Sequence, residues 1–125
     1  MNYISTPVND SPTISLTAGA ALSDVRGRAV QFDTNGKIIL AAADNIPLGI
    51  ATISNVSDIA SGEDVEVQVS AIGMVRAGAA IAPGNTLSPD STGSFIPTDG
   101  SYMAIALQGG TVGAYISALL VRGAV

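Results

Sequence analysis

Residues 26–39 read RGRAVQFDTNGKII, and residues 83–96 read PGNTLSPDSTGSFI. When the two stretches are aligned without gaps, they match at five positions: Gly27 with Gly84, Val30 with Leu87, Asp33 with Asp90, Gly36 with Gly93 and Ile39 with Ile96. The spacing D-x-x-G between two apolar runs is typical of a β-hairpin turn. The sequence therefore predicts a duplicated hairpin unit, and we expect its two copies to pack about a pseudo-two-fold axis.

The matched residues have a structural explanation in each copy. Gly27 and Gly84 allow a left-handed backbone that other residues resist. Asp33 and Asp90 can accept hydrogen bonds from backbone N–H groups two or three residues further on. Glycines then close both turns with positive φ, at Gly36 and Gly93. We expect these six residues to be structural turn residues and not parts of an active site.

Outside the repeat, the pattern is one of short strands. DVEVQVS, residues 64–70, places three valines on one face and Glu66, Gln68 and Ser70 on the other, as in a half-buried strand. Further strands are predicted at 13–17, 29–33, 37–41, 47–53, 73–77, 94–98, 102–108 and 113–121, with Gly-, Asn- and Asp-containing turns between them. Glycine and proline interrupt every candidate helix. The fold class is therefore all-β: a small β-barrel or sandwich of short strands, a single β-barrel-like domain over residues 13–125.

Residues 1–12 are predicted to form an extended N-terminal arm. They are rich in Asn, Ser, Thr and Pro, and their apolar residues follow no period. Such a segment is either a frayed terminus or one that becomes ordered on a partner, for example by adding a strand to a sheet edge. In the second case the candidate partner contacts are Tyr3, Ile4, Pro7 and Val8.

The composition predicts a folded surface that is either smooth and polar or partly covered by other molecules. Of 125 residues, 47% are hydrophobic and 12% are charged, whereas roughly 25% is usual for charged residues in soluble domains. Self-association would satisfy this composition, and a sticky monomer is the alternative. Five dispersed cations and a net charge of −5 argue against nucleic-acid binding. We expect no membrane span and no secretory signal, and hence synthesis in the cytoplasm.

The residues that most chemistry requires are absent. The chain has no histidine and no cysteine, which removes the commonest general base, the activated thiol and the best zinc ligands. A Ser–Lys pair would depend on Lys37 alone, and DTNG at Asp33 lacks the later acid of a calcium loop. Most acids that could serve as a glycosidase pair lie at predicted turns. We expect no enzyme activity, no cofactor and no metal.

The order of these segments resembles the small capsid cement, or head decoration, proteins of tailed bacteriophages. The resemblance covers roughly residues 14–121 and is carried by RGRAVQFDTNGKI, PLGIA, SGEDVEVQVSAIGMVRAG, AIAPGNTLSPDSTGSF, MAIALQ and VGAYISALLV. It implies a β-barrel-like virion protein on the outer surface of the head, often a homotrimer, that stabilises contacts between major capsid protein subunits. Synthesis would then take place in the host cytoplasm.

Two other functions remain open from the sequence. A carbohydrate-binding or adhesin module would need exposed aromatic rings near one another, and Tyr3, Tyr102 and Tyr115 are the candidates. A tail or baseplate structural subunit would share the same composition.

Overall fold

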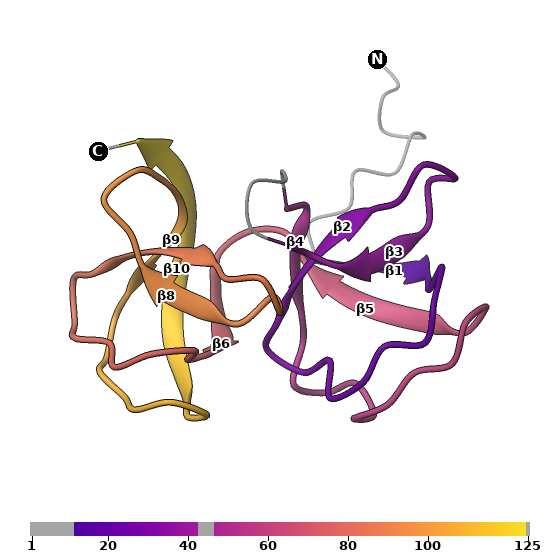
Figure 1. Ribbon diagram of the computed structural model, residues 1–125, viewed down its shortest axis with the longest axis horizontal. Coiled ribbons are helices and arrows are strands. Elements are labelled where there is room, and N and C mark those ends of the chain that lie inside the picture. The colour runs from indigo at the N-terminus through magenta and orange to yellow at the C-terminus, as the bar shows by residue number, and fades with distance from the viewer. Residues whose placement is uncertain (1–11, 43–46, 125) are drawn as a thin grey trace, which may run out of the picture.

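The computed structural model describes residues 12–42 and 47–124, which contain ten strands and no helix. The strands of the first half are β1 (Thr13–Thr17), β2 (Ala29–Phe32), β3 (Ile38–Leu40), β4 (Gly49–Ala51) and β5 (Asp64–Gln68). Those of the second half are β6 (Ile72–Arg76), β7 (Thr86–Pro89), β8 (Phe95–Pro97), β9 (Ser101–Ala106) and β10 (Tyr115–Ala124). Figure 1 shows the two halves side by side. The all-β prediction is confirmed.

The two halves share one topology. Each is an antiparallel five-stranded sheet, with the order β1-β5-β4-β2-β3 in the first and β6-β10-β9-β7-β8 in the second. Every strand of the second half therefore occupies the place of its counterpart five strands earlier. The hydrogen bonds between loops repeat as well: Gly27 N donates to Ala51 O and Gly84 N to Ala106 O, both at 2.8 Å. The duplication that the hairpin repeat predicts thus extends over five strands.

Each sheet is rolled until its two edges meet. A single parallel bridge joins Ala18, just after β1, to Ile38 in β3, and its counterpart joins Ala77 to Phe95. The N–H of the next glycine strengthens each bridge, with Gly19 donating to Ile38 O at 2.8 Å. Residues 13–125, predicted as one barrel-like domain, thus contain two small rolled sheets, one in each half.

Alternating side chains fill the inside of each roll. The first cluster is built around Val30, Ile38, Val65 and Val67, all 0% exposed. The second is built around Leu87, Phe95 and Ile116, and it also takes in three residues of the first half, Ala29, Ala41 and Ile50. The second core is therefore completed by the first half.

One strand and one strand face differ from the sequence prediction. β7 was not predicted, because Gly84 and Asn85 directly precede it and its last residue, Pro89, contributes no N–H to a ladder. Gln68, expected on the polar face of its strand, is 8% exposed, whereas Val69 is 37% exposed. The structure gives the reason: the second half covers that face of β5, and Gln68 Nε2 donates to Ser70 O (2.9 Å) and Ile72 O (2.8 Å).

Replacement of Phe95 by alanine should be strongly destabilising. Phe95 is the largest fully buried side chain, and it lies at the bridge that closes the second sheet. We expect Phe95→Ala to lower the free energy of unfolding by about 3–5 kcal/mol, measured by urea denaturation followed by circular dichroism. Ile96→Ala, on the outer face of the same strand, is the matched control and should cost much less. Equal losses would contradict this assignment of the core.

Candidate interaction surfaces

The six predicted turn residues lie at equivalent places in the two halves. Asp33 Oδ1 accepts from the N–H of Asn35 (2.7 Å) and of Lys37 (3.0 Å). Asp90 Oδ1 accepts from both the N–H and the hydroxyl of Thr92, each at 2.7 Å. The four glycines have positive φ: 75° at Gly27, 76° at Gly36, 88° at Gly84 and 86° at Gly93. These carboxylates therefore hold turns together.

The surroundings of these glycines are not equivalent. A Cβ added to Gly27 would lie 3.0 Å from Arg76 N and from the Tyr115 ring, and one on Gly93 would lie 2.9 Å from Ala29 O. Their counterparts, Gly84 and Gly36, have nothing within 4 Å of such an atom. A two-fold arrangement would bury both members of each pair alike. The expected pseudo-two-fold axis is therefore wrong: the halves pack head to tail, through different surfaces.

Backbone hydrogen bonds and arginines hold this junction together. Ala29 N donates to Gly93 O, and Arg76 N donates to Gly27 O, both at 2.8 Å. The Arg76 guanidinium pairs with Asp24, which also lies 3.7 Å from Arg28 Nη2. Arg28 Nη1 reaches across to Thr92 O at 3.1 Å. At another point, Arg122 Nη2 donates to Leu48 O at 2.9 Å. Three of the five cations of the chain, Arg28, Arg76 and Arg122, thus bridge the halves.

The outer faces of the two sheets differ in what covers them. In the first sheet, Thr13, Gln68, Ile50 and Ala29 form a row across four strands. In the second sheet, the equivalent row is Ile72, Leu119, Ile105 and Thr86. The second half covers the first row, where Gln68 is 8% and Ile50 0% exposed. The second row is open, with Ile72 60% and Leu119 38% exposed.

Further apolar residues enlarge the open face of the second sheet. Leu107, 47% exposed, follows β9 and donates its N–H to Ser117 O on the neighbouring strand. Val121, on β10, is 38% exposed. Contiguous exposed apolar area of this kind marks interaction surfaces in soluble proteins. Sequence reasoning missed this face, because β6, β9 and β10 become neighbours only in the folded sheet.

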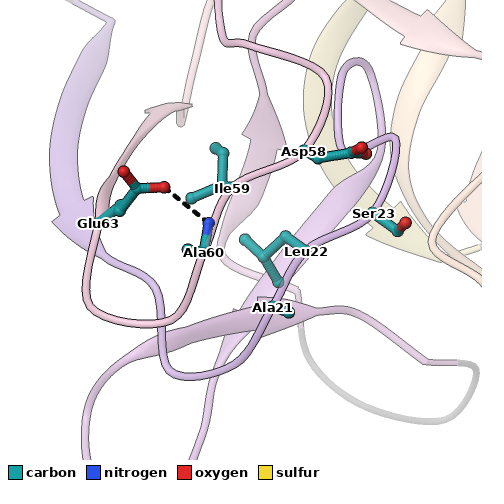
Figure 2. A pocket seen from close by; sticks show the side chains of 7 residues that line it. All are labelled: Ala21, Leu22, Ser23, Asp58, Ile59, Ala60 and Glu63. Carbon is teal, nitrogen blue, oxygen red and sulfur yellow. Dashed lines mark hydrogen bonds between the residues drawn. The ribbon is translucent and has the colours of Figure 1, made fainter.

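A shallow depression of about 320 Å³ lies on the first half, lined by Ala21, Leu22, Ser23, Asp58, Ile59, Ala60 and Glu63. Figure 2 shows Leu22 and Ile59 in its middle, with Glu63 on one side and Asp58 on the other. Both carboxylates accept backbone hydrogen bonds: Glu63 from Ala60 N at 2.8 Å, and Asp58 from Asp24 N at 2.9 Å. The positions of the two carboxylates are explained by these hydrogen bonds, which hold the loops around the depression.

The other residues that the sequence suggested as partner or carbohydrate contacts lie in different parts of the chain. Tyr3, Ile4, Pro7 and Val8 lie outside the described residues. Tyr115 packs against Gly27 at the junction, whereas Tyr102 packs against Gly123 of β10. Pro12, the last residue of the predicted arm, accepts a hydrogen bond from Val69 N at 2.8 Å and thus extends the first sheet. Over 12–42 and 47–124 no three His, Cys, Asp or Glu side chains gather as metal ligands would, and no helix has the length and apolarity to cross a membrane.

Comparison with known proteins finds a likeness of fold. No protein-family model matches the chain, and no curated protein matches it. Among solved structures, it is similar to the N base of head fiber gp8.5 in bacteriophage phi29, with a TM-score of 0.69 and 22% sequence identity. The similarity covers 90% of this chain and 96% of the other. The chain therefore shares its fold, in both halves, with a structure from a phage head fiber.

The head-to-tail junction predicts unequal effects of two equivalent substitutions. Gly36→Ala and Gly93→Ala both force alanine into a left-handed backbone, which costs roughly 1–2 kcal/mol. Only at Gly93 does the new Cβ also meet a carbonyl oxygen, Ala29 O. We expect the larger loss of unfolding free energy for Gly93→Ala, measured by urea denaturation at low protein concentration. Equal losses in the two variants would argue for equivalent surroundings, and hence against this junction.

Proposed function

We propose that this chain is a structural protein of a tailed-phage virion that binds the outer surface of the head, as capsid cement or decoration proteins do. The observation that carries the proposal is the likeness of fold to a phage head fiber base over 90% of the chain. The order of turns and strands that resembles cement proteins supports it from the sequence. The virion is thus the proposed location, and the major capsid protein the proposed partner.

The surface of the second half is suited to binding another protein. Ile72, Leu107 and Leu119 are exposed on or beside one sheet, and only 12% of the residues are charged. Association is favoured when such apolar area is removed from water. The excess of acidic residues would also repel nucleic acid. The proposed role is non-catalytic, and it agrees with the backbone hydrogen bonds that occupy Asp33, Asp90, Asp58 and Glu63.

The proposed mechanism is multivalent binding by a homotrimer. A rigid trimer offers three identical contacts, so that one dissociated contact re-forms before the other two are lost. Avidity of this kind can exceed a single affinity by roughly 10²–10⁴. Tyr3, Ile4, Pro7 and Val8 are the proposed capsid contacts of the arm. A protein bound across neighbouring capsid subunits would then resist their separation.

The purified protein should bind phage heads that lack it and stabilise them. We expect it to co-sediment with expanded, undecorated heads and to raise their melting temperature in calorimetry. At concentrations a hundredfold above the dissociation constant, binding adds about 2.7 kcal/mol per site. An unrelated acidic protein of the same size is the control. Heads that melt at the same temperature with and without the protein would rule out a cement role, and binding confined to isolated tails would assign it to the tail.

The arm should contribute to retention on the head and not to folding. Deleting residues 1–11, which leaves Pro12 in its hydrogen bond with Val69, should keep the unfolding midpoint and shorten retention on heads at least about tenfold. A full-length variant with Tyr3, Ile4 and Val8 replaced by serine should behave like the deletion if these side chains make the contact. Unchanged retention in both variants would remove the arm from the proposal.

A further inference from the structure

The outer side of the second sheet presents a continuous set of apolar side chains. Val75, Ala106 and Ala118 lie in the second core, so the alternate residues of β6, β9 and β10 point outward. Six outward residues on or beside these three neighbouring strands form what we call the apolar face: Ile72, Met74, Ile105, Leu107, Ser117 and Leu119. Residues paired across neighbouring strands are close enough for their side chains to touch.

The first sheet has polar side chains at five of the six equivalent positions. These are Thr13, Ser15, Thr52, Glu66 and Gln68, and the sixth is Ile50. The Ser15 hydroxyl donates to the Glu66 carboxylate at 2.9 Å, as is common on a sheet face that remains in water. The second sheet has the same topology and carries large apolar residues at five of the six places. This difference indicates that the apolar face is covered when the protein functions.

The one polar side chain of the apolar face already has a partner within the chain. The Ser117 hydroxyl donates to Gln108 Oε1 at 2.8 Å, and the Ser117 N–H donates to the same oxygen at 2.9 Å. An unpaired buried hydroxyl would be costly. Covering the apolar face therefore leaves the Ser117 hydroxyl satisfied.

The charges of the chain are divided unequally between the halves. Residues 71–125 contain two arginines and two aspartates, so the whole net charge of −5 belongs to residues 1–70. In a symmetric oligomer the same surface of each copy lies near the axis, and like charges that meet there repel one another. The first half would repel its own copy, whereas the apolar face carries no charge. Another copy of the chain is therefore the partner that this face fits.

We propose that copies of this chain associate through the apolar face, with the second halves gathered at the symmetry axis and the acidic first halves at the periphery. Removing these leucine and isoleucine side chains from water favours the contact. The inference specifies the self-contact of the homotrimer in the proposed function, on which it rests only for the biological setting.

Two substitutions give the apolar face the residues that the first sheet has at the same places. Leu119→Gln reproduces Gln68, and Ser117→Glu reproduces Glu66. Both positions are open to solvent in the single chain, so both variants should fold. We expect each to weaken self-association by about tenfold or more, measured by sedimentation equilibrium of the full chain. Ser117→Glu should have the larger effect, because it brings like charges together in a contact that excludes water.

Val56→Gln is the matched control. Val56 is 67% exposed and belongs to the first half, so this variant removes a similarly exposed apolar side chain outside the apolar face. It should assemble like the unmodified chain. Circular dichroism and urea denaturation at low concentration check that all three variants are folded.

Single cysteines test which surfaces meet, because the chain has no cysteine of its own. A disulfide forms only between residues whose Cα atoms lie about 4.4–6.8 Å apart. Under mild oxidation, at least one of Ile72→Cys, Leu107→Cys and Leu119→Cys should link two copies, and Val56→Cys should not. Failure of all three to form a link would overturn the proposal.

The remaining outcomes separate this inference from the proposed function. An unmodified chain that stays monomeric at hundreds of micromolar would overturn the inference. If that monomer binds phage heads and Leu119→Gln abolishes the binding, the apolar face contacts the capsid protein and the proposed function stands. If deletion of residues 1–11 makes the monomer associate, the arm covers the face. An oligomer formed through the apolar face that ignores phage heads would support this inference while contradicting the proposed function.

Discussion

The fold depends on one three-residue strand that serves two cores. All three residues of β4, Gly49–Ala51, are buried. Ala51 points into the core of the first half and Ile50 into that of the second. Gly49 lies so close to β5 that an added Cβ would be 2.2 Å from Gln68 O. In Figure 1, β4 lies at the side of the first half that adjoins the second. Neither half of this size could bury as much apolar surface alone.

Because β4 is shared, the two halves differ in the residues at equivalent positions although their topology is the same. The halves have the same strand order and the same backbone hydrogen bonds at their D-x-x-G turns, yet the position of Gln68 in the first is occupied by Leu119 in the second. Where the chain covers the position itself, the residue is a glutamine whose amide donates to the carbonyls of Ser70, between the two sheets, and of Ile72, at the start of β6. Where the chain leaves it open, the residue is a leucine. A covered site can satisfy a polar group locally, whereas an exposed leucine gains from a partner.

The features that could be predicted from the sequence are those that depend on residues close to one another along the chain. Positive φ and side-chain capping are fixed within a few residues, so the D-x-x-G turns at Asp33 and Asp90 could be located. Strict alternation likewise identified β5 from Val65 and Val67. β7 escaped prediction because its partners, β8 and β9, determine its conformation more than its own turn-forming residues do. The burial of Ile50 and Gln68, and the exposure of Ile72, follow from packing between halves. The pattern of apolar and polar residues within one strand does not show which face the other half will cover.

The double burial of β4 has a consequence for the order in which the chain is made. A ribosome completes β1 to β5 before it reaches β6, and the first sheet has all its strand partners by then. Until the second half is finished, Ala29 and Ile50 have no cover, although both are fully buried in the final fold. A nascent first half therefore displays an apolar surface to its neighbours on the same polysome, a condition under which misassembly between chains is common. Quick synthesis of residues 71–124 shortens that interval.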